Sequence, residues 1–460
     1  MAPKLVCFLF FLLYSQLVLF ITFSSASSSS SSPALCHQDQ SNALIQFKTA
    51  FSLIRRASIY CSDEGIKTYP KTKSWKKGTD CCKWDGVKCE NGTGNVIGLD
   101  LSCSWLSGPI HPNSSLFHLK RIQNLNLAHN DLQLSKIWPQ YASLVSLTHL
   151  NFSFSHLDGQ VPSQLSALSR LVSLDLGING VTLESSVWKY LLLHLTQLRE
   201  LALDHVYMDS IDPSTFSNLS SSLTLLSLNQ CDLKGEFPHT IVSLPNLQKL
   251  VLSENGDLTG DFSKSSWSKS LKHLDIQFTD IAGKLPNSIG NLKSLQYLDV
   301  SGCKFSGSIP ASIGNLKEMW FLSLFRNGFS GPIPYSIANL GQLKLLALSE
   351  NGITGKIPNI FDKLTKLVAL SLGNGLTGKI PNTICSLNQL QLLDFSNNSL
   401  SGTIPKCLGK LTKLQSLHLS DNHLVGPIPS GKVFRKFGVK TYAGNPGLCG
   451  FPLPKKCGRV

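Results

Sequence analysis

Apolar and polar residues alternate in a short pattern that recurs along most of this chain. In residues 271–283, apolar residues stand at the first, fourth, sixth and eleventh positions, and glycine stands at the thirteenth. The alternation around Leu274 and Ile276 has the period of two that is typical of a half-buried β-strand. We therefore expect these two side chains to face a core, while the polar residues beside them face outward.

The pattern returns at a nearly constant spacing. Its first apolar residue recurs at positions 295, 319, 343, 367, 390 and 414, so that five of the six spacings are 24 residues and one is 23. Earlier copies begin at 96, 122, 147, 171, 198, 223 and 247, which gives fourteen units between residues 96 and 437. Such units are leucine-rich repeats, and one coil buries its leucines only by stacking on its neighbours. The fold predicted is an α/β-type repeat, a curved leucine-rich-repeat solenoid with a parallel β-sheet on its concave face.

Two further positions predict how each coil turns. The residue after the strand is often asparagine, whose amide can bond the backbone of neighbouring coils: Asn130, Asn179, Asn255, Asn327, Asn351, Asn398 and Asn422. Nine units continue as Gly-x-apolar-Pro. Glycine permits a tight corner there, and proline ends the hydrogen bonding of the strand.

The ends of the chain predict an exported protein with a cap on each end of the repeats. We interpret residues 1–26 as a signal peptide, because one early lysine precedes a long apolar run and a small-residue site. The expected parts that follow are a Ser-rich spacer at 27–35, a cysteine-rich N-terminal cap at 36–95, the repeats at 96–437 and a C-terminal cysteine cap at 438–460. In the first cap, residues 41–51 predict an amphipathic helix capped by Ser41, and Trp84 is expected to cover the first coil.

The thirteen cysteines divide by position. Cys7 leaves with the signal peptide, while Cys231 and Cys303 take the asparagine position of coils too far apart for a disulfide to join them. An even number remains, which suits full oxidation in an exported chain: Cys36, Cys61, Cys81, Cys82, Cys89, Cys103, Cys385, Cys407, Cys449 and Cys457.

Spacing suggests only two of the disulfide pairs. The first six of the ten cysteines allow fifteen pairings, among which Cys82 with Cys89 is the shortest. Cys385 and Cys407 fall on adjacent turns and are plausible partners. Zinc binding is the competing interpretation, but the chain has no Cys-x-x-Cys and its compartment is oxidising, so we expect no metal site.

Charge and motifs narrow the classes of function. The chain carries 42 Lys and Arg against 28 Asp and Glu, a formal net charge of +14. Export excludes nucleic acid, so the excess suits either an acidic cell-wall polysaccharide or plain solubility. A basic cluster near the C-terminal cap allows the same choice between a solvated face and a polyanion or co-receptor site: Lys432, Arg435, Lys436 and Lys440.

Catalytic chemistry finds no support in the sequence. No nucleophile elbow, zinc-protease motif, phosphate-binding loop or kinase signature occurs, so we predict neither an enzyme nor a cofactor. His149, His205 and His273 project from predicted strands but lie several coils apart, and we expect them to bind no metal.

The outward strand positions predict a binding surface instead. Most of them are small or polar, whereas coils eight to eleven carry the candidate ligand-binding residues His273, Phe278, Tyr297, Phe321, Phe325, Arg326 and Leu345. Aromatic and arginine side chains gathered on a solvent-facing sheet are typical of protein and peptide hot spots. Asn-x-Ser/Thr motifs predict glycosylation at Asn91, Asn113, Asn151, Asn218 and Asn397. Glycans at Asn151 and Asn397 would flank this surface without covering it.

Several motifs together carry a family resemblance. The adjacent Cys81 and Cys82, the Leu-x-Gly-x-Ile-Pro coils, the Leu-Asp-Leu-Ser-Cys-Ser segment at 99–104 and the Gly-Asn-Pro-Gly-Leu-Cys-Gly closure at 444–450 resemble plant extracellular leucine-rich-repeat receptor-like proteins. The Cf-class resistance receptors of tomato are the best-known members. The resemblance implies a solenoid that senses pathogen or developmental ligands and signals through partner receptor kinases.

The chain departs from this family in two ways. Members usually interrupt the array with a non-repeat island, and they usually continue into an acidic segment and a transmembrane helix. Coils eleven to fourteen run without a break here, and the sequence stops at Val460. We therefore expect a form truncated before the membrane anchor.

Three functions remain open. The first is a receptor-type module that binds a protein or peptide ligand on its concave face in defence or developmental signalling. The second is a secreted inhibitor of a cell-wall-degrading enzyme such as polygalacturonase, and the third is a truncated, non-signalling receptor form. We expect secretion into the apoplast or cell wall, or the plasma membrane if a full-length form continues into a transmembrane helix.

Overall fold

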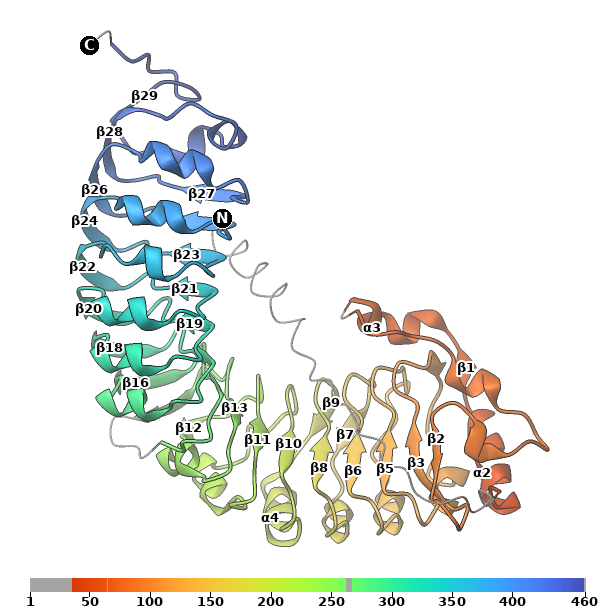
Figure 1. The fold of residues 1–460 in the computed structure, drawn as a ribbon. Coiled ribbons are helices and arrows are strands. Elements are labelled where there is room, and N and C mark those ends of the chain that lie inside the picture. Colours follow the sequence, from red (N-terminus) through yellow and green to blue (C-terminus); the bar gives the residue numbers. More distant parts are fainter. Residues whose placement is uncertain (1–34, 64, 262–266, 459–460) are drawn as a thin grey trace. The chain divides into compact units, whose positions relative to one another are not determined.

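The computed structural model describes residues 35–63, 65–261 and 267–458, and Figure 1 shows their course. The expected signal peptide and most of the spacer lie outside the described residues. Within these ranges, no helix is long and apolar enough to cross a membrane. The chain forms two compact units. Unit 1 runs to Leu198 and includes His205–Tyr207, and unit 2 comprises Arg199–Asp204 and the chain from Met208 onward.

The coils of unit 1 each place one strand in a parallel sheet. These strands are β3 (Val96–Asp100), β5 (Asn124–Asn126), β6 (His149–Asn151) and β8 (Ser173–Asp175). Strand β2 (Val87–Cys89) of the N-terminal cap pairs with β3 in the antiparallel direction. Leu125 lies opposite Leu150, so the inward leucines are in register as the repeat predicts.

The coils of unit 2 likewise each place one strand in a parallel sheet. Its strands are β10 (Glu200–Ala202), β11 (Leu225–Ser227), β13 (Lys249–Val251), β15 (His273–Asp275), β17 (Tyr297–Asp299), β19 (Phe321–Ser323), β21 (Leu345–Ala347), β23 (Ala369–Ser371), β25 (Leu392–Asp394) and β27 (Ser416–His418). The two units thus supply one strand for each of the fourteen predicted coils. We call the outward side of the sheet formed by β10 to β27 the sheet face.

A second parallel sheet runs along unit 2, which the sequence analysis did not predict. It consists of β12 (Gly235–Glu236), β14 (Leu258–Asp261), β16 (Asp280–Lys284), β18 (Lys304–Ser308), β20 (Gly328–Gly331), β22 (Gly352–Lys356), β24 (Gly375–Lys379), β26 (Ser399–Gly402), β28 (His423–Pro427) and β29 (Gly447–Cys449). Figure 1 shows the two sheets along different sides of the stacked coils. The repeat glycine enters this sheet with a left-handed backbone, as at Gly307 with a φ of 78°. In unit 1 the matching strands are β7 (Asp158–Gln160) and β9 (Gly180–Thr182).

Short helices complete most coils. They are the 3₁₀ helices η4 (Ser115–His118), η5 (Pro139–Ser143), η6 (Ser163–Ala167), η7 (Pro213–Asn218), η8 (His239–Ser243), η9 (Asn287–Asn291), η10 (Ala311–Asn315), η11 (Tyr335–Asn339), η12 (Phe361–Lys363), η13 (Asn382–Ser386) and η14 (Lys406–Lys410), and the α-helix α4 (Ser185–His194). The repeat proline stands at the N-cap of several, as Pro310 does for η10. Proline therefore both ends the strand and begins the helix, since its fixed φ suits a helix start.

A ladder of asparagines joins the coils from within. The amide nitrogen of Asn255 donates to the carbonyl oxygen of Leu228 on the preceding coil at 2.8 Å. Its amide oxygen accepts from the backbone N–H groups of Cys231 at 2.9 Å and Leu233 at 3.1 Å. The residue just before the ladder position is left-handed, as at Glu254 with a φ of 60°. The amide thus satisfies backbone groups that this turn withdraws from the sheet.

The N-terminal cap differs from its prediction at the helix start. Helix α2 spans Gln38–Lys48, its N-cap is His37, and no side chain caps it. Ser41 lies inside the first turns and donates its backbone N–H to the carbonyl of His37, so the predicted Ser41 cap is wrong. Trp84 is buried as expected and stacks on Trp75, with ring centroids 5.5 Å apart.

The rest of the N-terminal cap consists of short elements. They are β1 (Ser52–Leu53), which pairs with β4 (Leu106–Ser107) of the first coil, and η1 (Arg55–Ser58), α3 (Ile59–Asp63), η2 (Lys71–Ser74) and η3 (Cys81–Lys83). At the other end, η15 (Phe434–Lys436) and η16 (Val439–Thr441) precede β29.

All ten cysteines expected to be oxidised form disulfides. The pairs are Cys36–Cys81, Cys61–Cys103, Cys82–Cys89, Cys385–Cys407 and Cys449–Cys457. Both pairs that spacing suggested are among them. Cys231 and Cys303 belong to none of these disulfides and are buried in the ladder. The thiol of Cys303 points to the carbonyl oxygen of Ile276 at 3.0 Å, the bond that an asparagine amide makes in other coils.

Candidate functional site

Three ring-bearing residues of the predicted site share one row across neighbouring strands. His273, Tyr297 and Phe321 begin β15, β17 and β19, and each lies opposite the next in the sheet. The ring centroids of His273 and Tyr297 are 4.0 Å apart, and those of Tyr297 and Phe321 are 4.2 Å apart, with interplanar angles of 11° and 12°. The spacing of parallel strands, about 4.8 Å, brings in-register rings into stacking distance. We call these three residues the ring row, and Leu345 continues it on β21.

A tryptophan that the sequence analysis missed completes the aromatic cluster. The ring of Trp320 lies 5.7 Å from that of Phe321 and 5.6 Å from that of Tyr297, edge-on to both. The Nζ atom of Lys344 lies 6.0 Å from the centroid of the indole. Trp320 stands just before β19, outside the strand positions considered from sequence. Aligning the coils at this position would have revealed it, because the neighbouring coils carry Gln296 and Lys344 there.

The exposure expected for the central residues is wrong. The exposed fractions of Tyr297, Phe321 and Leu345 are 5, 2 and 3 %. Face-to-face stacking explains part of this, because each ring of the row covers the next. A ligand in this arrangement meets the partly exposed Trp320 and the edges of the row before it meets the ring faces.

The remaining predicted residues lie at the border of the row. Phe278 and Phe325 are half-buried, and Arg326 is exposed. Phe278 and Arg326 both have a φ of 52°, since they precede the ladder position of their coils. The left-handed turn directs these side chains differently from those of the strand, so they border the row and do not extend it.

Titratable groups in and beside the ring row have shifted pKa values. Asp275 and Asp299 lie opposite each other on β15 and β17. Burial raises the pKa of Asp299 to about 6, against hydrogen bonds from Ser301 that lower it. Burial and the neighbouring Asp299 raise the pKa of Asp275 well above its ordinary value. Burial, helped by the charge of Lys249, lowers the pKa of His273 to about 3, so a neutral imidazole stacks on Tyr297 at physiological pH.

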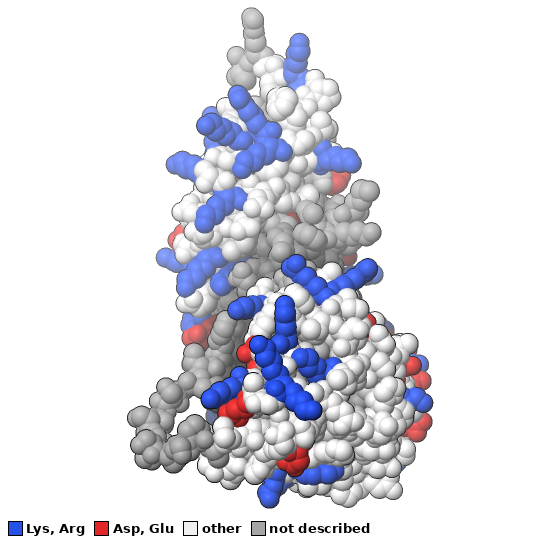
Figure 2. Space-filling model, turned by 90° about the vertical axis from the view of Figure 1, so that its right-hand side faces the viewer, with Lys and Arg blue, Asp and Glu red and all other residues white. Residues whose placement is uncertain are grey.

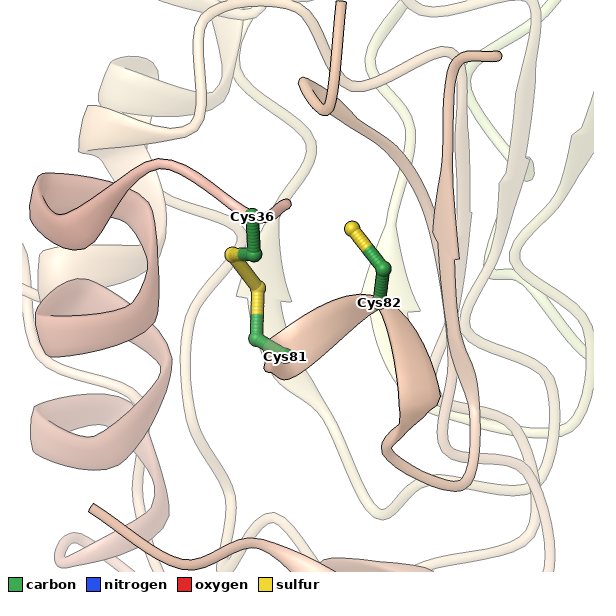
Figure 3. Close-up of side chains that lie close together, drawn as sticks. All are labelled: Cys36, Cys81 and Cys82. Carbon is green, nitrogen blue, oxygen red and sulfur yellow. A yellow bond between two sulfur atoms is a disulfide. The ribbon is translucent and has the colours of Figure 1, made fainter. Parts of the chain in front are cut away.

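Three cysteine sulfurs lie close enough together to be compared with a metal site. Sulfur atoms of Cys36, Cys81 and Cys82 lie within 4.8 Å of one another. Figure 3 shows the bond between the first two, with Cys82 separate from it. Cys82 is bonded to Cys89. All three sulfurs are thus committed to disulfides and offer no thiolate, which is the form that binds zinc.

His149, in unit 1, is exposed on β6 and contacts the hydroxyl of Thr148 at 2.9 Å.

The other predicted positions differ in exposure. Asn91, Asn113, Asn218 and Asn397 are exposed, whereas Asn151 is half-buried. The amide oxygen of Asn151 also accepts two hydrogen bonds from Ser153, each at 2.8 Å. Asn151 is therefore the least accessible of the five acceptors. The basic cluster near the C-terminal cap is exposed throughout: Lys432, Arg435, Lys436 and Lys440. Figure 2 shows many basic side chains and few acidic ones on the face drawn.

Comparisons with known families identify the repeat. The family model "Leucine rich repeat N-terminal domain" matches residues 37–90. Two leucine-rich-repeat models match residues 196–256 and, in five further segments, 270–292, 294–316, 342–364, 389–411 and 413–431.

Curated relatives of the chain are plant proteins. It is 40% identical over 268 residues to "Receptor-like protein 6" of Arabidopsis thaliana, which covers 56% of this chain and 27% of that protein. It is 41% identical over 271 residues to "Receptor-like protein Cf-9" of Solanum pimpinellifolium, covering 57% and 31%. The chain therefore matches only about a third of the length of these relatives.

Solved structures support the same fold. One of them, "Crystal structure of PEPR1-AtPEP1", has a TM-score of 0.62 and 26% identity, covering 90% of this chain and 59% of that one. Another, "Plant peptide hormone receptor RGFR1 in complex with RGF2", has a TM-score of 0.54 and 26% identity, covering 74% and 61%.

Proposed function

The chain is a leucine-rich-repeat protein of the plant receptor-like type, and we propose that it recognises an extracellular protein or peptide ligand. The observation that carries this proposal is the ring row on the sheet face of unit 2. Three stacked rings, with Trp320 edge-on to two of them, form an aromatic cluster of the kind that anchors interfaces.

The surroundings of the row favour a ligand with mixed chemistry. Arg326 and Lys344 are exposed beside the aromatic residues and can pair with carboxylates of a ligand. Asp275 and Asp299 follow His273 and Tyr297 by two residues and face the same side of the sheet. A peptide offers apolar, acidic and backbone groups together, which suits this arrangement better than a small apolar molecule does.

Relatives support the type of ligand. One structural neighbour is a plant peptide hormone receptor in complex with RGF2. For this chain, the ring row places the proposed peptide across strands β15 to β21. A place outside the cell and signalling through receptor kinases belong to the same proposal, since they follow from the family resemblance.

The proposal can be tested with peptides from extracellular fluid. The full secreted protein and its Tyr297→Ala/Phe321→Ala double variant are immobilised, and bound peptides from apoplastic fluid are identified by mass spectrometry. Peptides enriched only on the parent are synthesised, and their Kd is measured. Loss of an aromatic anchor should weaken binding about thirtyfold, which corresponds to about 2 kcal/mol.

Two controls make the result decisive. Ser371→Ala changes an outward strand position away from the row and should leave the Kd within about twofold. Far-UV circular dichroism checks that the double variant is folded, and Trp320→Ala alone should weaken binding without removing the stack. Equal enrichment on parent and double variant would exclude the ring row as the binding site.

A further inference from the structure

Unit 2 contains a cavity that shares no residue with the ring row. Its volume is about 570 Å³, and it is lined by Trp267, Lys269, Ser288, Asn291 and Lys293. Ser288 and Asn291 lie on η9, and Lys293 follows that helix by two residues. Trp267 and Lys269 come from the segment that leads into β15. The walls thus come from equivalent places in successive coils.

Hydrogen bonds hold one wall in place, and close packing on the next coil holds the other. The backbone N–H of Ser268 donates to the carbonyl of Val242 at 2.7 Å, and the hydroxyl of Ser270 donates to the carbonyl of Pro245 at 2.8 Å. These bonds fix the backbone on both sides of Lys269. On the other wall, a Cβ at Gly290 would lie 2.6 Å from the carbonyl oxygen of Ser312, so η9 packs directly on the next coil. The cavity is therefore formed between anchored segments.

The lining residues combine three kinds of chemistry. The half-buried Trp267 lines the cavity with its indole, an apolar group of the kind on which sugar rings stack. Ser288 and Asn291 offer a hydroxyl and an amide, which pair with sugar hydroxyl groups. Lys269 and Lys293 are exposed and offer two positive charges for carboxylates. We propose that this cavity binds an acidic oligosaccharide, a chain of uronate sugars.

The lysines continue beyond the cavity in the direction of stacking. Lys269, Lys293 and Lys317 occupy the same position of three successive coils, 24 residues apart. Neighbouring strands are about 4.8 Å apart, so these charges repeat on the scale of single sugar units. Lys317 is exposed, and its Nζ contacts only the carbonyl of Asn339 at 3.5 Å among the contacts described for it. The adjacent Glu318 is also exposed and limits the basic stretch on that side.

A polymer fits this arrangement better than a single anion. One cavity with an aromatic wall binds one sugar unit, and the row of lysines pairs with the carboxylates of the units that follow. The formal net charge of +14 adds a general attraction for a polyanion, which salt screens. Specificity for a saccharide comes from Trp267, because charge alone does not distinguish polyanions.

The experiment uses the full secreted protein and defined oligogalacturonates. Binding of the free-acid oligosaccharide is measured by calorimetry at two salt concentrations, beside its methyl-esterified, uncharged form and a poly-glutamate of similar charge. The free acid should bind, the methyl ester should lose about tenfold in affinity or more, and added salt should weaken binding.

Matched variants locate the site. Lys269→Ala/Lys293→Ala should weaken binding of the saccharide about tenfold. Trp267→Ala should weaken binding of the saccharide but leave binding of poly-glutamate unchanged. Lys432→Ala/Arg435→Ala removes the same two charges at exposed positions elsewhere in unit 2 and should change the affinity less than twofold. Lys269→Arg/Lys293→Arg keeps the charge and should retain most of the binding, which controls for folding.

Three results would overturn the proposal. Equal losses in the two charge-removing pairs would mean diffuse attraction with no site. A second such result is that Trp267→Ala leaves the saccharide affinity unchanged and that poly-glutamate binds as tightly as the saccharide. The cavity would then be a general anion surface or one for acidic protein segments. No binding of the free acid at low salt would remove the site altogether. Each result is independent of the ring row, so the peptide proposal stands or falls separately.

Discussion

The ring of Phe278 occupies the space that a side chain at Gly302 would need. A Cβ at Gly302 would lie 2.7 Å from Cε1 of Phe278. Gly302 also has a φ of 63°, in the left-handed region that favours glycine. The two residues precede the ladder position in successive coils, so the aromatic ring of one coil lies over the turn of the next.

Replacing this glycine should therefore strain unit 2. Gly302→Ala is expected to displace the Phe278 ring and to lower the free energy of unfolding by about 1–2 kcal/mol. Denaturant unfolding measures the change. Gly341→Ala is the matched control, because a Cβ there meets nothing within 4 Å, and it should be neutral or slightly stabilising. Equal destabilisation by both substitutions would contradict the packing of Phe278.

The ring row should contribute to stability through stacking. Phe321→Leu keeps an apolar side chain but loses the ring 4.2 Å from Tyr297, and should lower the free energy of unfolding by about 1 kcal/mol. Tyr297→Phe keeps both stacks and should preserve the near-ultraviolet circular dichroism of the row. A Phe321→Leu protein as stable as the parent would show that stacking adds nothing.

The ladder asparagines should be among the most sensitive polar positions. Asn255→Ala leaves the buried N–H groups of Cys231 and Leu233 without their acceptor, and the carbonyl of Leu228 without its donor. We expect a loss of about 3 kcal/mol, since each unsatisfied buried group costs about 1–3 kcal/mol. Asn246→Ala, which removes an exposed amide bonded to Ser221, is the control and should lose less than about 1 kcal/mol.

The thiols of Cys231 and Cys303, which lie outside the disulfides, should be unreactive in the folded protein. Burial raises the pKa of Cys303 to about 12, so the reactive thiolate is scarce at pH 8. Iodoacetamide should label neither Cys231 nor Cys303 in the native state and both in guanidinium chloride, as peptide mass spectrometry can show. Rapid native labelling of Cys303 would mean that its coil opens readily. Cys303→Asn should fold, because the amide can take over the bond to the carbonyl of Ile276.

The disulfides of the N-terminal cap should differ in how much each one stabilises the folded protein. Cys61–Cys103 joins residues 42 apart, whereas Cys82–Cys89 joins residues 7 apart. In the chain-entropy description, the longer loop stabilises by about 1.5 kcal/mol more. Replacing each pair by alanines and comparing thermal unfolding of the purified proteins tests this order. The opposite order would show that local packing around Cys82 outweighs loop length.

The coil register could be read from the sequence to the residue. Leu274 is 1 % exposed, and Leu274 and Leu298 lie opposite each other, as a strict 24-residue period requires. The period is informative because one residue of slippage would turn every leucine outward. The position of Cys303 in the ladder followed from the same register.

What sequence reasoning missed depends on contacts between coils. The second sheet joins segments whose own residues are mostly glycine, serine and lysine, which have no strand pattern. Trp320 lies one residue before the strand, where the alternation of inward and outward positions no longer applies. The left-handed φ of Phe278 is set by the ladder turn, although phenylalanine has no preference for it. The cavity beside Trp267 arises between two coils, and no single repeat shows it.

Because every coil keeps the same register, whole repeats can be lost or gained during evolution without disturbing the core. Loss of residues 295–318, one whole repeat, would bring Phe321 opposite His273 while leaving every inward leucine inward. Gain of one repeat between the same two residues would instead separate them by two strands, where one strand separates them now. Unequal exchange between gene copies, when it respects the 24-residue period, thus reorders the side chains that a ligand meets and leaves the core unchanged. The recognition surface of such a protein can therefore change by one coil at a time.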